Sequence, residues 1–126
     1  MELIIGGAFQ GKSDYAKEHH PDICWKEGRE LEEDEIFTAA GVLNFHEFIR
    51  KEMQAGKDLD GFAQELIKRN PELVLTSCEI GYGVVPVDAF DRAYREKVGR
   101  ICTILAAHCR KVTRVMCGIG TVIKDA

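Results

Sequence analysis

Long apolar runs are missing from this sequence, and so is the pattern of a secretory signal. The longest uninterrupted apolar stretches are only a few residues, whereas a membrane-spanning helix needs about 20. Met1 is followed by Glu2 and a short Leu3-Ile4-Ile5 run, without a basic segment or a long apolar segment behind it. We therefore expect no membrane span and no secretion, and we predict a cytoplasmic protein.

An excess of basic residues is missing as well. The chain has 17 Lys and Arg against 21 Asp and Glu, which gives a net charge of −4. Non-specific nucleic-acid binding requires a basic surface, so we do not expect a nucleic-acid partner. This balance leaves room for a local basic pocket that binds a phosphate.

Paired cysteines of the kind that hold zinc or form redox sites are also missing. The 5 cysteines are an odd number, and none of them is spaced as CxxC. Most of them lie in apolar runs, which is typical of buried, reduced thiols in a cytosolic protein.

The residues that are present predict one globular domain. The chain has 126 residues, of which 45% are hydrophobic and 30% are charged. Folding a chain of this size buries roughly two-thirds of its extended surface, enough for one modest core. No internal repeat, low-complexity tract or linker divides it, so we expect a single domain over residues 1–126.

Alternating short apolar runs and amphipathic stretches predict an α/β fold. The expected strands cover residues 2–5, 22–25, 72–78, 112–117 and 121–123, and the expected helices cover 12–19, 36–54, 59–68 and 88–109. Asp58 or Asp60 is the expected cap of the third helix and Asp88 that of the fourth. This alternation indicates a small, mostly parallel sheet flanked by helices.

The first strand leads into a phosphate-binding motif. Gly6-x4-Gly11-Lys12-Ser13 fits the pattern GxxxxGK[ST] and stands between an apolar strand and a helix. Backbone N–H groups of such a loop point at phosphate oxygens, and the N-terminus of the helix adds partial positive charge. Lys12 would bind the β- and γ-phosphates, and Ser13 would ligate Mg²⁺. The predicted nucleotide-binding residues are Gly6, Gly7, Ala8, Phe9, Gln10, Gly11, Lys12 and Ser13.

A magnesium site in such proteins needs a second group, usually an acid at the end of a neighbouring strand. Glu79 follows the third expected strand directly, and the carboxyl ends of parallel strands are where α/β sites form. Alternatively, Glu79 caps backbone amides in the Gly-rich turn behind it. Asp34 and Glu35 also precede an apolar run, but a solvated acidic face explains that stretch better.

Three segments of the chain resemble one enzyme family. They are Ile4-Ile-Gly-Gly-Ala-Phe-Gln-Gly-Lys-Ser13, then Glu79-Ile-Gly-Tyr-Gly-Val-Val-Pro86 with Phe90-Asp-Arg-Ala-Tyr-Arg95 and Val98-Gly-Arg100, and finally Val115-Met-Cys-Gly-Ile-Gly120 leading to Lys124. Together they resemble the adenosylcobinamide kinase / adenosylcobinamide-phosphate guanylyltransferase family of cobalamin biosynthesis. The resemblance covers residues 1–18 and 72–124.

The resemblance implies a three-layer P-loop NTPase fold, RecA- or kinase-like, and a homo-oligomer that is a trimer in the family. It implies ATP or GTP with Mg²⁺ as cofactor, and a corrinoid as the other substrate. The family phosphorylates the aminopropanol hydroxyl of adenosylcobinamide and then transfers GMP to that phosphate through a guanylylated histidine. By position, the 79–86 loop and Arg92, Arg95 and Arg100 would shape the phosphate site and the subunit contacts.

The middle of the chain departs from the family. Relatives are several tens of residues longer, and the missing part falls in residues 22–70, where the family has the nucleotide-accepting histidine and an acid-ending strand. His46 is the only histidine there. Between two phenylalanines it is either a packed helix residue or a covalent nucleotide acceptor with Glu47 as partner.

These observations leave three hypotheses for function. The first is a nucleotide-dependent kinase, with Lys12 and Glu79 as catalytic residues. The second is a non-catalytic or regulatory GTP- or ATP-binding relative that has lost the transfer segment. The third adds guanylyl transfer through His46.

Overall fold

A computed structural model describes residues 1–7, 10–78 and 88–126. Six strands form one sheet in the order β2-β3-β4-β1-β5-β6. They are β1 (Glu2–Gly6), β2 (Trp25–Glu27), β3 (Gly41–Leu43), β4 (Val74–Cys78), β5 (Lys111–Met116) and β6 (Ile119–Asp125). All neighbours pair in parallel except β5 and β6, which are antiparallel.

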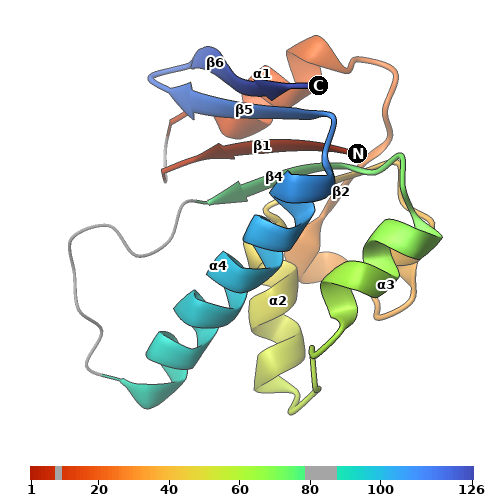
Figure 1. The fold of residues 1–126 in the computed structure, drawn as a ribbon, viewed down its shortest axis with the longest axis vertical. Coiled ribbons are helices and arrows are strands. Elements are labelled where there is room, and N and C mark those ends of the chain that lie inside the picture. The colour runs from red at the N-terminus through yellow and green to blue at the C-terminus, as the bar shows by residue number, and fades with distance from the viewer. Residues whose placement is uncertain (8–9, 79–87) are drawn as a thin grey trace.

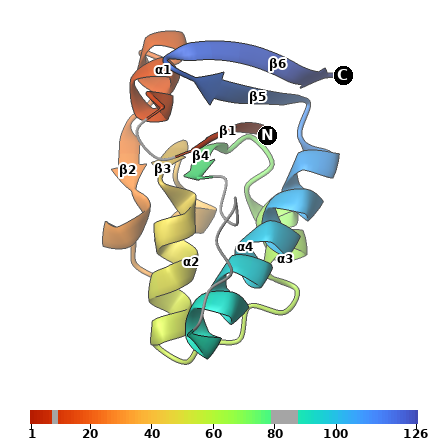
Figure 2. The same ribbon diagram turned by 90° about the vertical axis from the view of Figure 1, so that its left-hand side faces the viewer.

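The helices cover both faces of this sheet. They are α1 (Lys12–His19), α2 (Phe45–Gln54), α3 (Phe62–Arg69) and α4 (Ala89–His108), with two 3-10 turns at Gly28–Glu30 and Glu35–Phe37. Figure 1 shows α2, α3 and α4 on one side of the sheet and α1 on the other, and Figure 2 shows the same layers from the side. This arrangement confirms the predicted mixed α/β fold with a mostly parallel sheet flanked by helices.

The central strand β1 is apolar on both faces because both faces are covered. Leu3 pairs in register with Leu75 of β4 and Val112 of β5, and all three side chains belong to the larger core under α2, α3 and α4. Ile4 points the other way, into a smaller cluster with Ala16 of α1. Continuous apolar runs are typical of such buried parallel strands.

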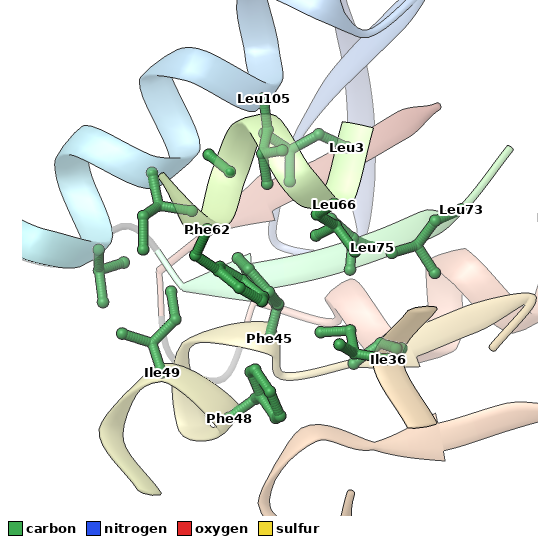
Figure 3. Packing of buried hydrophobic residues seen from close by; sticks show 14 of the residues in the cluster. Leu3, Ile36, Phe45, Phe48, Ile49, Phe62, Leu66, Leu73, Leu75 and Leu105 are labelled. Atoms are coloured by element: carbon green, nitrogen blue, oxygen red, sulfur yellow. The ribbon is translucent and has the colours of Figure 1, made fainter. Parts of the chain in front are cut away.

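Phenylalanines hold α2 and α3 together in the larger core. Phe45 and Phe48 of α2 are 0% and 1% exposed, and their ring centroids lie 6.3 and 5.7 Å from the ring centroid of Phe62 of α3. Figure 3 shows these rings beside Leu66 and Leu75. Aromatic contacts at this distance add stability to that gained from the buried apolar area. These rings therefore hold α2 against α3.

The predicted helix over residues 36–54 is wrong in its first half. Residues 35–37 form a 3-10 turn, Gly41–Leu43 is the buried strand β3, and only Phe45–Gln54 is helical. A three-residue strand that is buried on both faces shows no alternation of apolar and polar residues. Val42 therefore fitted the helical spacing of the apolar residues that follow it, and the strand was included in the predicted helix. Asn44, in the left-handed region with φ 57°, makes the turn from strand to helix.

Smaller predictions also shift. The second strand is Trp25–Glu27 rather than 22–25. The N-cap of the third helix is Gly61, which has φ 77°, so neither Asp58 nor Asp60 caps it. Asp88 caps α4 as predicted, accepting a hydrogen bond of 2.8 Å from the Phe90 N–H. Of the cysteines only Cys109 is buried, while Cys24 and Cys117 are exposed.

A tight turn joins β5 to β6. Met116 pairs with Ile119, and the two residues between them, Cys117 and Gly118, have φ of 52° and 75°. Two successive positive φ values define a type I′ hairpin turn, whose twist matches that of the strands. The backbone N–H groups of this turn contact Gln10.

Candidate functional site

The carboxyl ends of the central strands meet at one edge of the sheet. In Figure 1 the arrowheads of β1, β4 and β5 all point to the left. The residues that follow β1 and β3 begin α1 and α2, so the first turns of both helices also lie at this edge. Open parallel sheets bind ligands at this edge.

Lys12 stands at the start of α1 and is 7% exposed. Its Nζ donates a hydrogen bond of 2.9 Å to the carbonyl oxygen of Gly7 and lies 3.7 Å from Sγ of Cys78, the last residue of β4. The ammonium group is therefore held between the two central strands. From there a phosphate oxygen could replace the Gly7 carbonyl as its partner.

Two glycines of the motif are required by the backbone. A Cβ on Gly6 would lie 2.5 Å from the carbonyl oxygen of Val115, so β1 and β5 approach too closely for a side chain there. Gly11 has φ 84°, and its Cβ would also lie 3.2 Å from Cα of Gly118. Glycine adopts the conformation of Gly11 at no cost, and the close approach of β5 accounts for Gly6. Both positions are therefore explained independently of a ligand.

Two hydrogen bonds of Gln10 connect the end of the phosphate loop to the β5–β6 turn. Its side-chain Oε1 accepts a hydrogen bond of 2.7 Å from the Cys117 N–H, and its carbonyl oxygen accepts one of 2.8 Å from the Gly118 N–H. The loop end and the first turn of α1 therefore have a fixed position relative to β5.

His46 enters the same edge from the first turn of α2. Its Nδ1 accepts a hydrogen bond of 3.1 Å from the backbone N–H of Cys78, and its carbonyl oxygen accepts one of 3.1 Å from Tyr94 Oη. Burial lowers the pKa of His46, and Lys12 lowers it further, while Glu47 and Glu27 raise it. The net direction is downward, so the neutral imidazole is favoured.

Asn44 precedes His46 at the end of β3. Its backbone N–H donates a 2.8 Å hydrogen bond to Oγ1 of Thr76, and its side-chain Nδ2 donates one of 3.0 Å to Oε2 of Glu27. Glu27 is the last residue of β2. The ends of β2, β3 and β4 are thus connected by polar contacts at the edge where the motif lies.

These groups surround one pocket, the phosphate-loop pocket, of about 330 Å³. Its lining residues are Gln10, Gly11, Lys12, Ser13, Asp14, Asn44, His46 and Cys78. Small-molecule sites have volumes of this order, with a few converging polar groups.

The structure brings some of the predicted site residues together and leaves others elsewhere. Gln10, Gly11, Lys12, Ser13 and His46 line the pocket, and Gly6 and Gly7 lead into it. Ala8, Phe9, Glu79 and the loop through Pro86 lie outside the described residues.

The three predicted arginines lie along α4. Arg95 forms an ion pair with Asp91 at 3.0 Å, and Arg100 forms one with Glu96. Arg92 is exposed. None of them is among the described residues that line the phosphate-loop pocket.

Asn44 and Cys78 line the pocket without having been predicted. Cys78 ends an expected parallel strand, so the rule that favours the carboxyl ends of strands could have identified it. Asn44 had no such signal, because the sequence placed it inside a helix rather than at the end of β3.

Two absences hold for the described part of the chain. Over residues 1–7, 10–78 and 88–126, no group of three or more His, Cys, Asp and Glu side chains is placed to hold a metal ion. Nor does any helix in these ranges combine the length and the apolar character that crossing a bilayer requires.

Comparison with known proteins gives one family. The sequence model of the family described as cobinamide kinase / cobinamide phosphate guanyltransferase matches residues 36–123. The match includes Asn44, His46 and Cys78 and extends through residues 36–70, while the phosphate-binding motif lies before it. No curated protein matches the chain.

Proposed function

Because the chain belongs to the cobinamide kinase / cobinamide phosphate guanyltransferase family, we propose that it is a nucleotide-dependent kinase of cobalamin biosynthesis. It would transfer the γ-phosphoryl group of ATP or GTP to the aminopropanol hydroxyl of adenosylcobinamide. The observation that carries this proposal is the convergence of Lys12, Ser13 and His46 on one pocket. A single P-loop nucleotide-binding domain over residues 1–126 is part of the proposal.

The proposed chemistry depends on position and charge. Phosphoryl transfer needs little covalent help from a protein, and its barrier falls when the charge on the phosphoryl oxygens is neutralised in fixed geometry. The Lys12 ammonium is already buried beside the pocket, so little reorganisation is needed when a triphosphate arrives. The N–H groups of the first turn of α1 would add hydrogen bonds to the phosphates.

The residues present fit Mg²⁺ that binds together with the nucleotide. This ion is usually held by one or two protein oxygens, with phosphate oxygens and water completing its shell. The Ser13 hydroxyl lines the pocket and could supply one such oxygen, and Glu79 remains the proposed second group. When bound, the ion would neutralise charge on the β- and γ-phosphates.

Corrinoid-dependent turnover is the test of this function. Purified protein would be incubated with Mg²⁺, ATP or GTP and adenosylcobinamide, and the phosphorylated corrinoid measured by mass spectrometry. Lys12→Ala should lower turnover by about 10²–10³-fold, as expected for the loss of one preorganised charge contact. Lys17→Ala, on the exposed part of the same helix, serves as the matched control.

Two outcomes would contradict the proposed kinase function. Equal turnover by Lys12→Ala and the parent would show that the pocket around Lys12 is not the catalytic site. Tight calorimetric binding of ATP or GTP without any corrinoid product would favour the non-catalytic nucleotide-binding protein instead.

We also propose that the protein is a homo-oligomer, as trimeric relatives would imply. Met116, Ile119, Val122 and Ile123 are large apolar side chains between 45% and 70% exposed on the β5–β6 hairpin. Such a cluster on an edge strand favours self-association. Sedimentation equilibrium of the parent and of Ile119→Lys would test this, and a monomeric parent would contradict it.

A further inference from the structure

His46 has one ring nitrogen that the protein already uses. The backbone N–H of Cys78 can only donate, so Nδ1 of His46 must be the acceptor in their 3.1 Å hydrogen bond. A neutral imidazole that accepts at one nitrogen carries its proton on the other. The backbone of β4 therefore fixes the tautomer of His46 with the proton on Nε2.

The surroundings keep this ring neutral and in place. The side chain of His46 is 12% exposed, and Tyr94 of α4 holds the carbonyl oxygen of the same residue. Burial and the Lys12 ammonium both disfavour a second proton on the ring and lower its pKa. The charged groups that act on it are Glu47 on its own helix α2, Lys12 of α1 and Glu27 of β2.

The Nε2–H group lacks a good partner in the described part of the chain. The nearest carboxylate oxygen, Oε1 of Glu47, is 3.6 Å away on a side chain that is 41% exposed, which is too far for an ordinary hydrogen bond. Nε2 is not one of the fully buried polar atoms that lack a partner among the described residues, so this N–H group is accessible to a group that enters the pocket. His46 lines the phosphate-loop pocket, where a bound anion would supply the acceptor.

We infer that His46 is a fixed hydrogen-bond donor, which binds a phosphate oxygen of the nucleoside triphosphate through Nε2–H. This inference rests on the proposed nucleotide site and assigns the histidine a role in it. A covalent nucleotide acceptor would need a nitrogen lone pair directed at phosphorus. In His46 the lone pair of Nδ1 is occupied by the Cys78 N–H, and Nε2 carries the proton.

The experiment compares two substitutions at the same position. His46→Gln keeps an N–H₂ donor on a side chain of similar reach, whereas His46→Phe keeps the ring shape and removes every donor. Calorimetry would give the dissociation constants for ATP and GTP with Mg²⁺, with His108→Gln on the exposed end of α4 as control. Long-range ¹H–¹⁵N NMR of the parent would locate the ring proton before and after addition of nucleotide.

The donor role predicts that His46→Phe binds nucleotide about 10- to 100-fold more weakly, as expected for a hydrogen bond to a charged group. His46→Gln should recover most of this loss, and NMR should place the proton on Nε2. Unchanged affinity in His46→Phe, or a ring proton on Nδ1, would overturn the inference. Acid-labile label from radioactive GTP that His46→Asn abolishes would overturn it too, in favour of guanylyl transfer.

Failure of the inference and failure of the site give different results. If the parent binds nucleotide, Lys12→Ala does not, and His46→Phe binds like the parent, only the role of His46 is wrong. If the parent binds neither ATP nor GTP, the nucleotide site itself is wrong and the donor role falls with it. Thermal melts of each variant show whether a loss of binding reflects unfolding, and the NMR result on the parent does not depend on any variant.

Discussion

The first and last turns of α2 each bury one ionisable side chain, in two different pockets. His46, in the first turn, lines the phosphate-loop pocket. Glu52, near the last turn, lines an acidic pocket between α2 and α3. The acids of this acidic pocket are Glu33, Asp34, Glu52, Asp58, Asp60 and Glu65.

Burial favours the neutral form at both ends, so it lowers the pKa of His46 and raises the pKa of Glu52. The groups that contact the two side chains differ. His46 is oriented by a backbone N–H at the end of β4, whereas the charges around Glu52 are carried by side chains such as Lys57 and Glu33, and these two are 43% and 61% exposed. A backbone donor on a central strand fixes direction, and long exposed side chains do not. The first turn of α2 therefore holds its ionisable side chain in a fixed direction, ready for a ligand, and the last turn does not.

The substitution with the largest expected effect on stability removes packing that both turns share. Phe48 lies between them on α2 and is 1% exposed, so Phe48→Ala should lower the free energy of unfolding by about 3–5 kcal/mol. Urea denaturation would measure the loss, with Phe48→Leu as a milder control. A loss below about 1 kcal/mol, ordinary for an exposed site, would show that the phenylalanine cluster does not hold α2.

The next effect concerns the entry into α2. Asn44→Ala should cost about 1–2 kcal/mol, because alanine disfavours the left-handed conformation at φ 57° and loses the hydrogen bond to Glu27. Asn44→Gly removes the same hydrogen bond but accepts this φ, so thermal unfolding should find it more stable than Asn44→Ala. The reverse order would mean that the backbone conformation is not the main constraint.

A smaller effect appears in the pH dependence of stability at the first turn. The folded pKa of His46 lies below the ordinary histidine value of 6.5, so between the two values the unfolded chain binds more protons. Stability should therefore fall as the pH falls through 6.5 towards the folded pKa. His46→Gln should flatten this slope in urea titrations from pH 5 to pH 8. An equal slope in His46→Gln and the parent would contradict the assignment.

At the last turn the sign is opposite. The folded pKa of Glu52 lies above the ordinary glutamate value of 4.5, so between the two values the folded chain binds more protons. Stability should fall as the pH rises from 4.5 through the folded pKa. Glu52→Gln should remove this slope and raise the melting temperature at pH 7. A lower melting temperature for Glu52→Gln would show that its charge is compensated.

Much of the fold could be predicted because several signals are local. The apolar run over residues 72–78 predicted β4, and the amphipathic stretch over residues 88–109 predicted α4. Strand β3 was missed because three residues carry too little periodicity to compete with the helix pattern that follows them.

The candidate site was predictable only where its residues are neighbours in sequence. The motif placed Lys12 and Ser13 at the start of the helix that follows β1, as the structure has them. His46 could not be placed beside Lys12, because their proximity depends on β3 lying next to β4, and β4 next to β1. His46 is nearly buried, as expected for a packed helix residue, and it also lines the pocket. Its predicted role as a covalent nucleotide acceptor stays a prediction.

The contacts of Gln10 with the β5–β6 turn have a consequence for synthesis of the chain. The partners of this residue, Cys117 and Gly118, are more than 100 positions later in the sequence, and β1 pairs on its two sides with strands that begin at Val74 and Lys111. During translation the N-terminal motif therefore emerges long before anything that fixes its shape. We expect nucleotide binding to be acquired abruptly, after the last hairpin has left the ribosome, since pairing over such sequence distances closes late and slowly.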